Sequence, residues 1–524
     1  MSGRVFSRRM VLALGGGGAV LAAAPAFGQL VAAPVFQDYP FQLGVASGDP
    51  APDGFVIWTR LAPRPFEIGC GMPAAVVPVR YEIAADDAFK TIARNGEALA
   101  RPELGHAVHV EVTGLEPGRP YWYRFICGSE RSLVGRAKTL PAAGADVAAV
   151  RFAVGGCQHY EQGFFTAWRH AAAEDLDFIY CYGDYIYEGR GSRVRTLSGQ
   201  PQETPRQHFG SEIYSIDDYR RRYAQYKMDA DLQAAHAAAP WFSVWDDHEI
   251  DNNWASSLDQ DGTPPQIFAL RQQMAMQAFY EHTPLRARSL PRGPQLALYR
   301  RATYGQLLDV SFLDTRQFRS DQQCADKWRV ACPEIERSDA AMLGDAQENW
   351  LFDGLSGSRA KWKALAQQVM VMDLDRDPGD VQAVNLDSWA GYRTPRARLL
   401  KFLQERRIGN SVVLTGDEHQ NYAGELHLDG RNPGKTPIAV EFVATSIASG
   451  GDGQDQRADM AAIQAVNAQL KFNNNQRGYV VCDVTKERWL TSFKVVDKVS
   501  ARGGAISVRA KWAVADGDPR LVQA

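Results

Sequence analysis

The strongest structural signal in this 524-residue chain is the segment Phe178-Ile179-Tyr180-Cys181-Tyr182-Gly183-Asp184-Tyr185-Ile186-Tyr187. Its first half is a continuous apolar run, which is typical of a strand buried on both faces of a sheet. The run ends at a glycine, and an acidic residue follows directly. Loops at the carboxyl ends of parallel strands build binding sites in α/β domains, so the segment predicts such a domain with a polar site beside this strand.

Several segments farther along the chain fit the same architecture. Apolar strands are predicted over Phe152–Gly156, Pro240–Trp245 and Ser411–Thr415, and helices over Tyr219–Ala237 and Ala341–Leu355. Strands that alternate with helices indicate an α/β domain. We therefore predict one such domain over residues 150–524. It includes a C-terminal tail whose last part, residues 505–524, is expected to form a helix or a lid.

The region before residue 145 has a different pattern. Short strands such as Phe55–Arg60 and Tyr121–Phe125 are separated by turns such as Leu115–Gly118. Short strands with regularly placed turn signals predict a β-sandwich of immunoglobulin or fibronectin type over residues 30–145. The sequence of this region contains no cluster of catalytic residue types.

The first 29 residues have the pattern of an export signal. Arg8 and Arg9 precede a short apolar stretch, Val11–Ala23, and small residues follow up to Ala26. This order predicts a bacterial twin-arginine signal peptide over residues 1–29, the twin-arginine export machinery as a partner, and a periplasmic or secreted protein. The alternative is a membrane anchor, but the stretch is shorter than the roughly 20 residues that span a bilayer, and it contains glycines. No permanent membrane anchor is therefore expected.

Overall charge and cysteine content set further bounds. Lys plus Arg is 58 and Asp plus Glu is 61, which gives a formal net charge of −3. Because proteins that bind nucleic acids stably are usually basic, no nucleic acid is expected as a stable partner. Seven cysteines leave at least one unpaired. Cys324 and Cys332 lie eight residues apart in a polar stretch and can close a disulfide loop in an oxidising compartment. Cys181 and Cys482 lie in apolar runs and are expected to be buried thiols.

Four polar clusters follow predicted strands of the α/β domain. They are Cys157-Gln158-His159, Asp184 to Tyr187, Asp246-Asp247-His248-Glu249 with Asn252-Asn253, and Asp417-Glu418-His419. Taken singly, each residue has an ordinary structural explanation, such as a helix cap or a buried thiol. Together they offer thiolate, carboxylate, imidazole and phenolate ligands, so the combination favours a metal site. Two metal ions about 3.5–4 Å apart would promote displacement at phosphorus. A Gly-x-Ser-x-Gly motif is absent from the sequence, which argues against a serine hydrolase.

Six strings, in this order along the chain, resemble the PhoD-type alkaline phosphatases of the calcineurin-like metallophosphoesterase superfamily. They are Gly156-Cys157-Gln158, Gly183 to Glu188, Trp245 to Glu249, Leu313 to Gln317, Asp387 to Tyr392 and Thr415 to His419. The resemblance implies an α/β fold in which a two-sheet sandwich is flanked by helices and preceded by the all-β domain. It also implies two cofactors, ferric iron and calcium.

By position in these motifs, the resemblance assigns roles to single residues. The iron ligands would be Cys157, Asp184, Tyr187 and His419. Asp184 would also bridge to calcium, whose further oxygen ligands would be Asp246, Asn253 and Asp417. Asp247, His248 and Glu249 would orient the ligands or contact phosphate, and His248 is a hypothetical proton donor to the leaving oxygen. Asp184, Asp247 and His248 are thus the predicted catalytic residues.

The sequence departs from the family pattern at Glu418, where a small apolar residue is common, at Ala390, where an acidic residue is common, and at Asp251, where Glu is common. These changes bear on substrate preference and metal content rather than on the reaction class. Two further groups have open roles. Arg190, Arg193 and Arg195 either contact an anionic ester or are simply solvated, and Trp389 and Tyr392 either wall the pocket or pack in the core.

The expected function is that of an exported, metal-dependent phosphoesterase that hydrolyses small phosphate monoesters, diesters or both. Two alternatives remain open at the level of sequence. The first is a phospholipase D-like phosphodiesterase on the same scaffold. The second is a non-enzymatic envelope-binding protein with a vestigial metal site.

Overall fold

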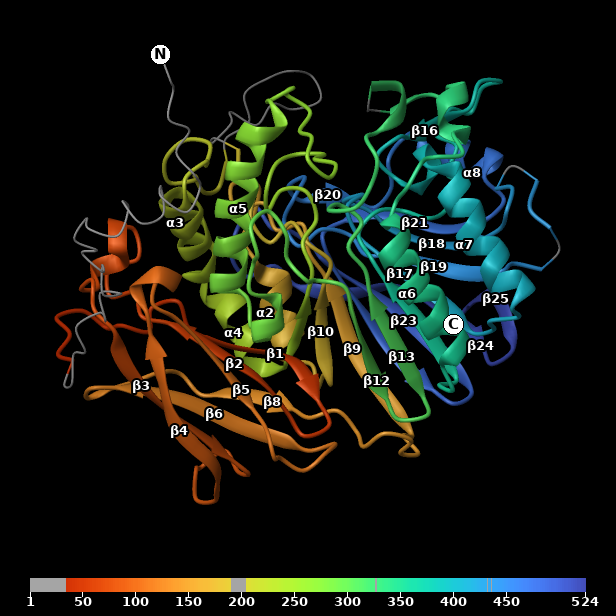
Figure 1. The fold of residues 1–524 in the computed structure, drawn as a ribbon. Helices are drawn as coiled ribbons and strands as arrows, with labels where there is room; N and C mark the ends of the chain where they lie inside the picture. The colour runs from red at the N-terminus through yellow and green to blue at the C-terminus, as the bar shows by residue number, and fades with distance from the viewer. Residues whose placement is uncertain (1–33, 190–203, 326–327, 431, 435) are drawn as a thin grey trace, which may run out of the picture.

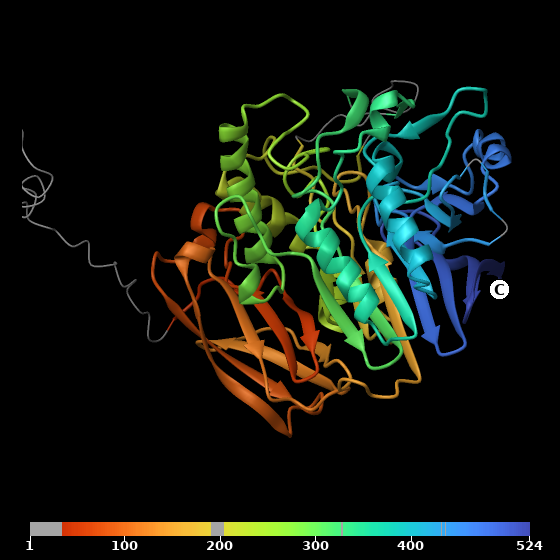
Figure 2. The same ribbon diagram turned by 45° about the vertical axis from the view of Figure 1, so that its right-hand side comes forward.

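The computed structural model describes residues 34–189, 204–325, 328–430, 432–434 and 436–524. Two large β-sheets pack against each other in its centre, helices flank them, and a smaller all-β region lies at one end (Figures 1 and 2). The predicted signal peptide and the loop of Arg190, Arg193 and Arg195 lie outside the described residues. No helix in the described ranges is long and apolar enough to cross a membrane.

The first large sheet has ten strands among the described residues. In spatial order they are β25 (Asp518–Gln523), β24 (Ile506–Ala515), β23 (Arg488–Val496), β22 (Gly478–Thr485), β9 (Ala149–Gly155), β10 (Phe178–Cys181), β11 (Trp241–Ser243), β1 (Val45–Ala51), β2 (Gly54–Arg60) and β5 (Ala107–Val112). The central strands β9, β10 and β11 are parallel. All four residues of β10 are buried, as its continuous apolar sequence predicts.

The second large sheet has eight strands in the described part of the chain. Their order is β12 (Arg300–Tyr304), β13 (Leu308–Phe312), β15 (Trp362–Ala366), β17 (Ser411–Thr415), β19 (Ala439–Val443), β18 (Asn421–Leu426), β21 (Leu470–Gln476) and β20 (Gly453–Gln454). Four of these strands, from β13 to β19 in this order, are parallel. The two sheets share one apolar core, in which the rings of Phe242 and Phe312 stack 4.3 Å apart.

Helices cover both sheets. The first group packs against the core that the two large sheets share: α2 (Thr166–Ala172), α3 (Ile216–Lys227), α4 (Ala230–Ala238) and α5 (Pro265–His282). A second group covers the second sheet: α6 (Gly344–Gly357), α7 (Arg393–Glu405) and α8 (Met460–Val466) (Figure 1). The single helix predicted over residues 219–237 is wrong. The Asp229 carboxylate accepts hydrogen bonds from the backbone N–H groups of Asp231 and Leu232, which starts a new helix there.

The N-terminal region is a two-layer β structure that shares a sheet with the rest of the chain. One layer is a separate sheet of β4 (Ile92–Ala100), β3 (Val77–Ala84), β6 (Pro120–Cys127), β7 (Glu130–Arg131) and β8 (Gly135–Lys138). The other layer is β1, β2 and β5, and β1 pairs in parallel with β11 through Gly48 and Trp241. A core that includes Phe55 and Tyr123 lies between the layers. The fold class predicted from the sequence is confirmed, and the boundary near residues 145–150 stays a prediction.

Two smaller expectations have clear outcomes. The disulfide between Cys324 and Cys332 is confirmed, and it lies beside the two-stranded sheet of β14 (Trp328–Val330) and β16 (Ala383–Asn385). The helix or lid expected over residues 505–524 is wrong, because this segment forms β24 and β25. The alternation of apolar residues from Ile506 to Val514 has a period of two, which is the period of a strand and not of a helix.

Lys227, at the end of α3, is an unusual buried cation. Its side chain lies between the rings of Trp58 and Tyr185, with Nζ 4.2 Å and 5.1 Å from the ring centroids. Nζ has no hydrogen-bond partner within the described residues. Burial lowers the pKa of Lys227 from 10.5 to about 7, because desolvation disfavours the charged form.

We expect Lys227 to make the protein more stable as the pH rises from 7 to about 10.5. In this window the unfolded chain keeps the Lys227 proton and the folded chain has lost it, so folding releases a proton and the free energy of unfolding rises with pH. The slope contributed by one group has a ceiling of about 1.4 kcal/mol per pH unit. Urea unfolding at several pH values measures it. Lys227→Met should lose this slope, whereas Lys401→Met, at an exposed position on α7, should keep it. Equal slopes in wild type and Lys227→Met would refute the prediction.

Candidate metal centre

The structure brings the four predicted clusters together. Cys157 follows β9, Asp184 and Tyr187 follow β10, Asp246 follows β11, and the pair Asp417 and His419 follows β17. The first three strands belong to the ten-stranded sheet and β17 to the eight-stranded sheet. The site therefore lies where the carboxyl ends of strands from both sheets come together. The side chains of Cys157, Asp184, Tyr187 and Asp246 are buried, and those of Asp417 and His419 are partly buried.

One group of side chains converges on a carboxylate oxygen of Asp184. Its Oδ2 lies 3.3 Å from Cys157 Sγ and 2.8 Å from the Tyr187 hydroxyl. The same hydroxyl lies 3.2 Å from His419 Nε2. Burial lowers the pKa of His419 to about 3, which keeps its imidazole neutral and able to donate a lone pair to a metal. Thiol, carboxylate, phenol and imidazole thus meet at one point.

A second group consists of carboxylates. Single oxygens of Asp246, Asp247 and Asp417 lie within 4.8 Å of one another, and Asp247 also groups with Asp184 and His248. Within the described chain, Asp246 Oδ2 and Asp247 Oδ1 are buried without a hydrogen-bond partner. Burial, together with the neighbouring carboxylates, raises the pKa of Asp417 well above its usual range. Carboxylates that repel one another and keep some buried oxygens without a hydrogen-bond donor fit a bound cation.

The buried side chain of Arg316 supports the carboxylate group. Its Nε donates to Asp246 Oδ1 at 2.6 Å, and Nη1 lies 2.8 Å from Asp387 Oδ2. Gln322 joins the network, because its Nε2 donates to the Asn253 carbonyl at 2.7 Å and to Asp387 at 2.8 Å. Asn253 itself donates its backbone N–H to Asp247 Oδ2. The sequence strings contained Arg316 and Asp387, but nothing in their spacing indicated that they form ion pairs beneath the site.

Glu249 joins the two strand-end loops that carry the site. Its carboxylate accepts hydrogen bonds from the backbone N–H groups of Asp184 at 3.1 Å, Tyr185 at 2.6 Å and Asp246 at 2.9 Å. Glu249 is completely buried. It is therefore a positioning group, which is one of the roles that the sequence left open for it.

Several residues of the site have a left-handed backbone conformation that residues other than glycine rarely adopt. Cys157, Asp184, Asn253, Asp417 and His419 all have positive φ angles, between 48° and 62°. Such left-handed residues outside glycine cluster at functional sites, where the surrounding structure maintains the strain. Gly183, with φ of 122°, is required for a further reason: a Cβ there would lie 2.2 Å from the backbone nitrogen of Asp246.

His248 lies beside the first group as a charged imidazole. Its Nδ1 is 2.7 Å from Glu188 Oε2, and its ring lies 4.1 Å from the ring of Tyr187. Burial acts to lower the pKa of His248, but Glu188, Asp247 and Asp184 outweigh it and hold that pKa well above the usual range. Glu188 belongs to the Gly183–Glu188 string, but nothing in that string indicates its ion pair with His248.

The remaining positions of interest are structural. Glu418 forms a buried ion pair with Arg376 and accepts from Asn385, and it belongs to neither group described above. Trp389 and Tyr392 are core residues of the second sheet's helical side, so the packing alternative holds for them. Asp251 pairs with Arg271 at 2.9 Å, and Ala390 lies in the small apolar cluster beside the disulfide.

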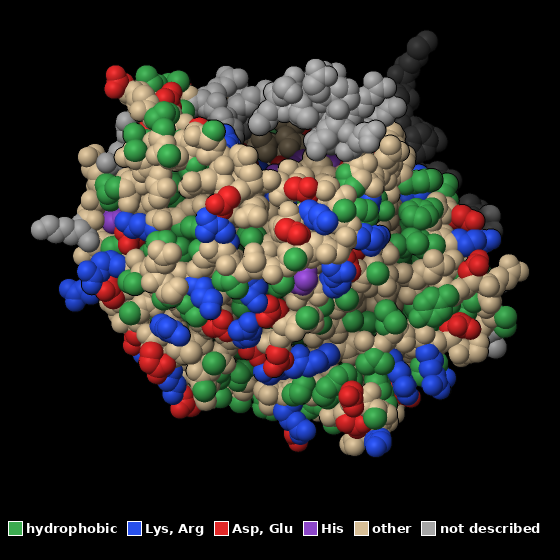
Figure 3. Space-filling model, turned by 180° about the vertical axis from the view of Figure 1, so that it is seen from behind, with side chains coloured by type: hydrophobic (Ala, Val, Ile, Leu, Met, Phe, Trp, Pro, Cys, Tyr) green, Lys and Arg blue, Asp and Glu red, His purple; other side chains and the backbone are tan. Residues whose placement is uncertain are grey.

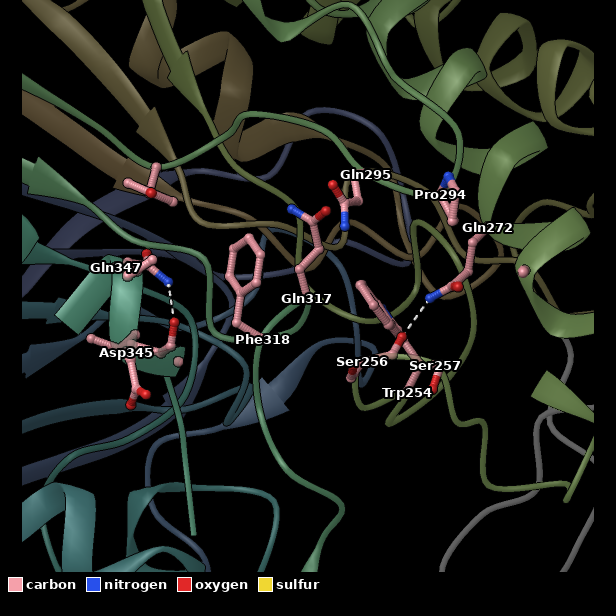
Figure 4. Close-up of a pocket in the computed structure, with 15 residues that line it drawn as sticks. Trp254, Ser256, Ser257, Gln272, Pro294, Gln295, Gln317, Phe318, Asp345 and Gln347 are labelled. Atoms are coloured by element: carbon pink, nitrogen blue, oxygen red, sulfur yellow. Dashed lines mark hydrogen bonds between the residues drawn. The ribbon is translucent and has the colours of Figure 1, made fainter. Parts of the chain in front are cut away.

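A cavity of about 450 Å³ lies beside the loops of the centre (Figure 4). Trp254, which follows Asn253, and Gln317, which follows Arg316, contribute to its wall. None of its lining residues belongs to the groups that converge at the strand ends. The molecular face opposite to that of Figure 1 carries interspersed basic and acidic side chains, in keeping with the small net charge (Figure 3).

A two-sheet α/β sandwich with such a cluster of ligand-type side chains at its strand ends fits the phosphoesterase class that the sequence motifs indicate. The chain belongs to the PhoD-like phosphatase family: the profile of that family matches residues 152–493, and the profile of the PhoD-like phosphatase N-terminal domain matches residues 26–141. The resemblance inferred from the motifs is thereby confirmed.

Two relatives support this assignment over nearly the whole chain. Alkaline phosphatase D of Bacillus subtilis (strain 168) is 46% identical over 481 residues, which cover 92% of this chain and 82% of that protein. A solved structure described as the structure of PhoD superposes with a TM-score of 0.91 at 45% identity, covering 94% of this chain and 93% of that one. The chain is therefore a phosphatase hydrolase of small phosphoesters. Its family implies metal dependence, which the residue groups of the centre fit.

We expect Glu249→Gln to weaken both folding and metal binding. The amide of glutamine turns an NH₂ group toward one of the three backbone donors, which costs about 1–3 kcal/mol for a buried unsatisfied group. Because both loops then lose their common anchor, metal affinity should fall by about 10–100-fold. Urea unfolding and elemental analysis of dialysed protein measure the two effects. Glu405→Gln, at an exposed position on α7, is the control. Full metal content in Glu249→Gln would show that the anchor is dispensable.

Proposed function

We propose that the chain is an exported alkaline phosphatase that uses ferric iron and calcium to hydrolyse phosphate monoesters, diesters or both. The observation that carries this proposal is the convergence of Cys157, Tyr187 and His419 on Asp184, beside a separate group of carboxylates. When bound, the two kinds of ion would neutralise the phosphoryl oxygens and lower the pKa of an attacking water.

Ferric iron is the cation proposed for the first group, held by Cys157, Asp184, Tyr187 and His419. Calcium takes hard oxygen ligands, whereas thiolate and imidazole are softer ligands that suit transition metals, so Cys157 and His419 argue against calcium in this group. Burial raises the pKa of the Cys157 thiol and of the Tyr187 phenol well above their usual ranges. Both groups would therefore stay protonated without a metal ion. A strongly charged cation bound between them would favour the loss of both protons.

Calcium is proposed for the second group, with Asp246, Asn253 and Asp417 as ligands and Asp184 shared between the ions. Their oxygen chemistry suits a hard cation. Asp247 lies among the same carboxylates, and its Oδ1, which accepts no hydrogen bond and is 3.6 Å from Arg316 Nη2, is proposed to face the cation or its water. Arg316 offsets part of the negative charge and fixes the direction of Asp246.

His248 is proposed as the proton donor to the leaving oxygen. Its contact with Glu188 keeps the ring protonated and oriented, and its side chain is 20% exposed, so it can reach a bound ester. Asp184 and Asp247 complete the proposed catalytic set. Export by the twin-arginine machinery to the periplasm or beyond rests on the sequence of residues 1–29 alone.

The phenolate of Tyr187 provides a direct test of the iron site. Wild-type protein should show the visible charge-transfer band of a phenolate bound to ferric iron, and Tyr187→Phe should lose this band and keep at most the weaker absorption of a Cys157 thiolate bound to the same iron. The variant should also lose most of its phosphatase activity. Absorption spectroscopy with elemental analysis and rate measurements on a monoester and a diester follow these changes, with Tyr81→Phe in the N-terminal sheet as control. A colourless wild type that is fully active would overturn the iron assignment.

The role of His248 is tested by varying the leaving group. Loss of a general acid costs about 10²–10⁴-fold in rate, and mostly for leaving oxygens that need a proton. We therefore expect His248→Gln to slow hydrolysis of an alkyl phosphate far more than that of a nitrophenyl phosphate. Steady-state kcat values for both esters decide the matter. Equal losses for the two esters would assign His248 to phosphate binding and contradict proton donation.

A further inference from the structure

A cleft of about 430 Å³ lies where the N-terminal strands meet the two large sheets. It is formed by the end of β1, the linker that enters β9, Phe242 of β11, the start of β12 and the segment after α5. None of its lining residues belongs to the groups of the metal centre. Its volume falls within the range of about 300–1,000 Å³ that is common for small-molecule sites.

The charged side chains of this cleft are mostly basic. Arg286, Arg288 and Arg300 line it, together with a single carboxylate, Asp49. Arg300 and Asp49 form an ion pair at 2.7 Å in which both side chains are 3% exposed. Arg286 pairs with the neighbouring Glu111 at 3.0 Å. Each acidic group is thus already matched by one arginine.

Arg288 is the cation left over. In the ranges that the structure describes, its guanidinium makes no hydrogen bond or ion pair, although it lies close enough to Arg300 and Arg286 to feel their charges. The Arg288 residue is exposed at the mouth of the cleft. Partial desolvation and the like charges of Arg300 and Arg286 lower the pKa of Arg288. The nearby carboxylates of Asp49 and Glu111 act on this pKa in the opposite direction. A fourth lining arginine, Arg301, is excluded from this count because its guanidinium lies over the ring of Trp350, 4.8 Å from the centroid.

An anion would relieve this arrangement. Guanidinium groups bind phosphate through paired N–H donors, and such charge-assisted hydrogen bonds are among the strongest that proteins make. The rest of the lining is rich in proline, alanine and glycine, including Pro50, Pro141 and Gly144, and offers no further carboxylate to compete with a ligand. Phosphate is favoured over other oxyanions because the family's reaction releases it, which is the one step that rests on the assigned activity.

We propose that this cleft is a second, non-catalytic binding site for a phosphate group, either the free ion or part of a small phosphorylated molecule, held by Arg288 with Arg286 and Arg300. The site is separate from the metal centre in its residues. It would retain product or anchor a phosphorylated ligand without taking part in the hydrolysis.

Equilibrium dialysis with radiolabelled inorganic phosphate tests the site. The metal-loaded wild type should bind two phosphates per chain, and chelator-treated protein should keep one of them. Arg288→Gln should lose the chelator-resistant phosphate, with at least tenfold weaker affinity, and keep wild-type phosphatase activity. Arg292→Gln removes the same charge from the exposed loop nearby and should change neither number.

The chelated protein also separates the sources of the ligand. Glycerol phosphate that displaces the label better than inorganic phosphate would indicate a phosphorylated molecule, and the reverse would indicate the free ion, whereas glycerol should not compete. Tungstate soaked into crystals should give an anomalous peak beside Arg288. Unchanged chelator-resistant binding in Arg288→Gln, or an equal loss in Arg292→Gln, would overturn the proposal, as would chelated wild type that binds no phosphate.

Discussion

The centre of this protein depends on one buried carboxylate that holds two loops at once. Glu249 accepts the backbone N–H groups of Asp184, Tyr185 and Asp246, which lie at the ends of adjacent parallel strands. Backbone donors at strand ends have no ladder partner, and burying them without an acceptor is costly. By satisfying three of them, Glu249 fixes the distance between the Asp184 loop and the Asp246 loop. The relative positions of the side chains that these two loops carry depend on that distance.

The strained backbone becomes intelligible on this basis. Residues with left-handed φ are tolerated only where neighbouring contacts over-determine them. Asp184 is held by Glu249 through its own N–H, and Asn253 is held by Asp247 in the same way. Arg316 then restrains Asp246 from below. The chain therefore concentrates several buried charges in one place, and a cation is the component that would balance them.

The sequence predicted the ligand-type residues of the site more completely than the ion pairs and hydrogen bonds that hold them in place. Apolar strands followed directly by Cys157, Asp184, Asp246 and Asp417 are visible because burial and polarity change within one or two residues. The helix break at Asp229 and the strands after Ile506 were missed because capping and a period of two compete with weak helical signals. The ion pairs of Arg316 could not be predicted, since partners about 70 residues apart in sequence meet only through the packing of two sheets. No local pattern encodes such a contact.

The N-terminal region has a structural role that its separate sequence pattern conceals. Strand β11 has only three residues, and it is held between β10 on one side and β1 on the other. Without β1, the strand that leads to Asp246 would be an edge strand with unpaired backbone groups. Burial of Lys227 between Trp58 of β2 and Tyr185 of the metal loop adds a second link across the same boundary. The N-terminal strands therefore complete the sheet on which the metal centre stands, which gives a physical reason for the two regions to occur in one chain.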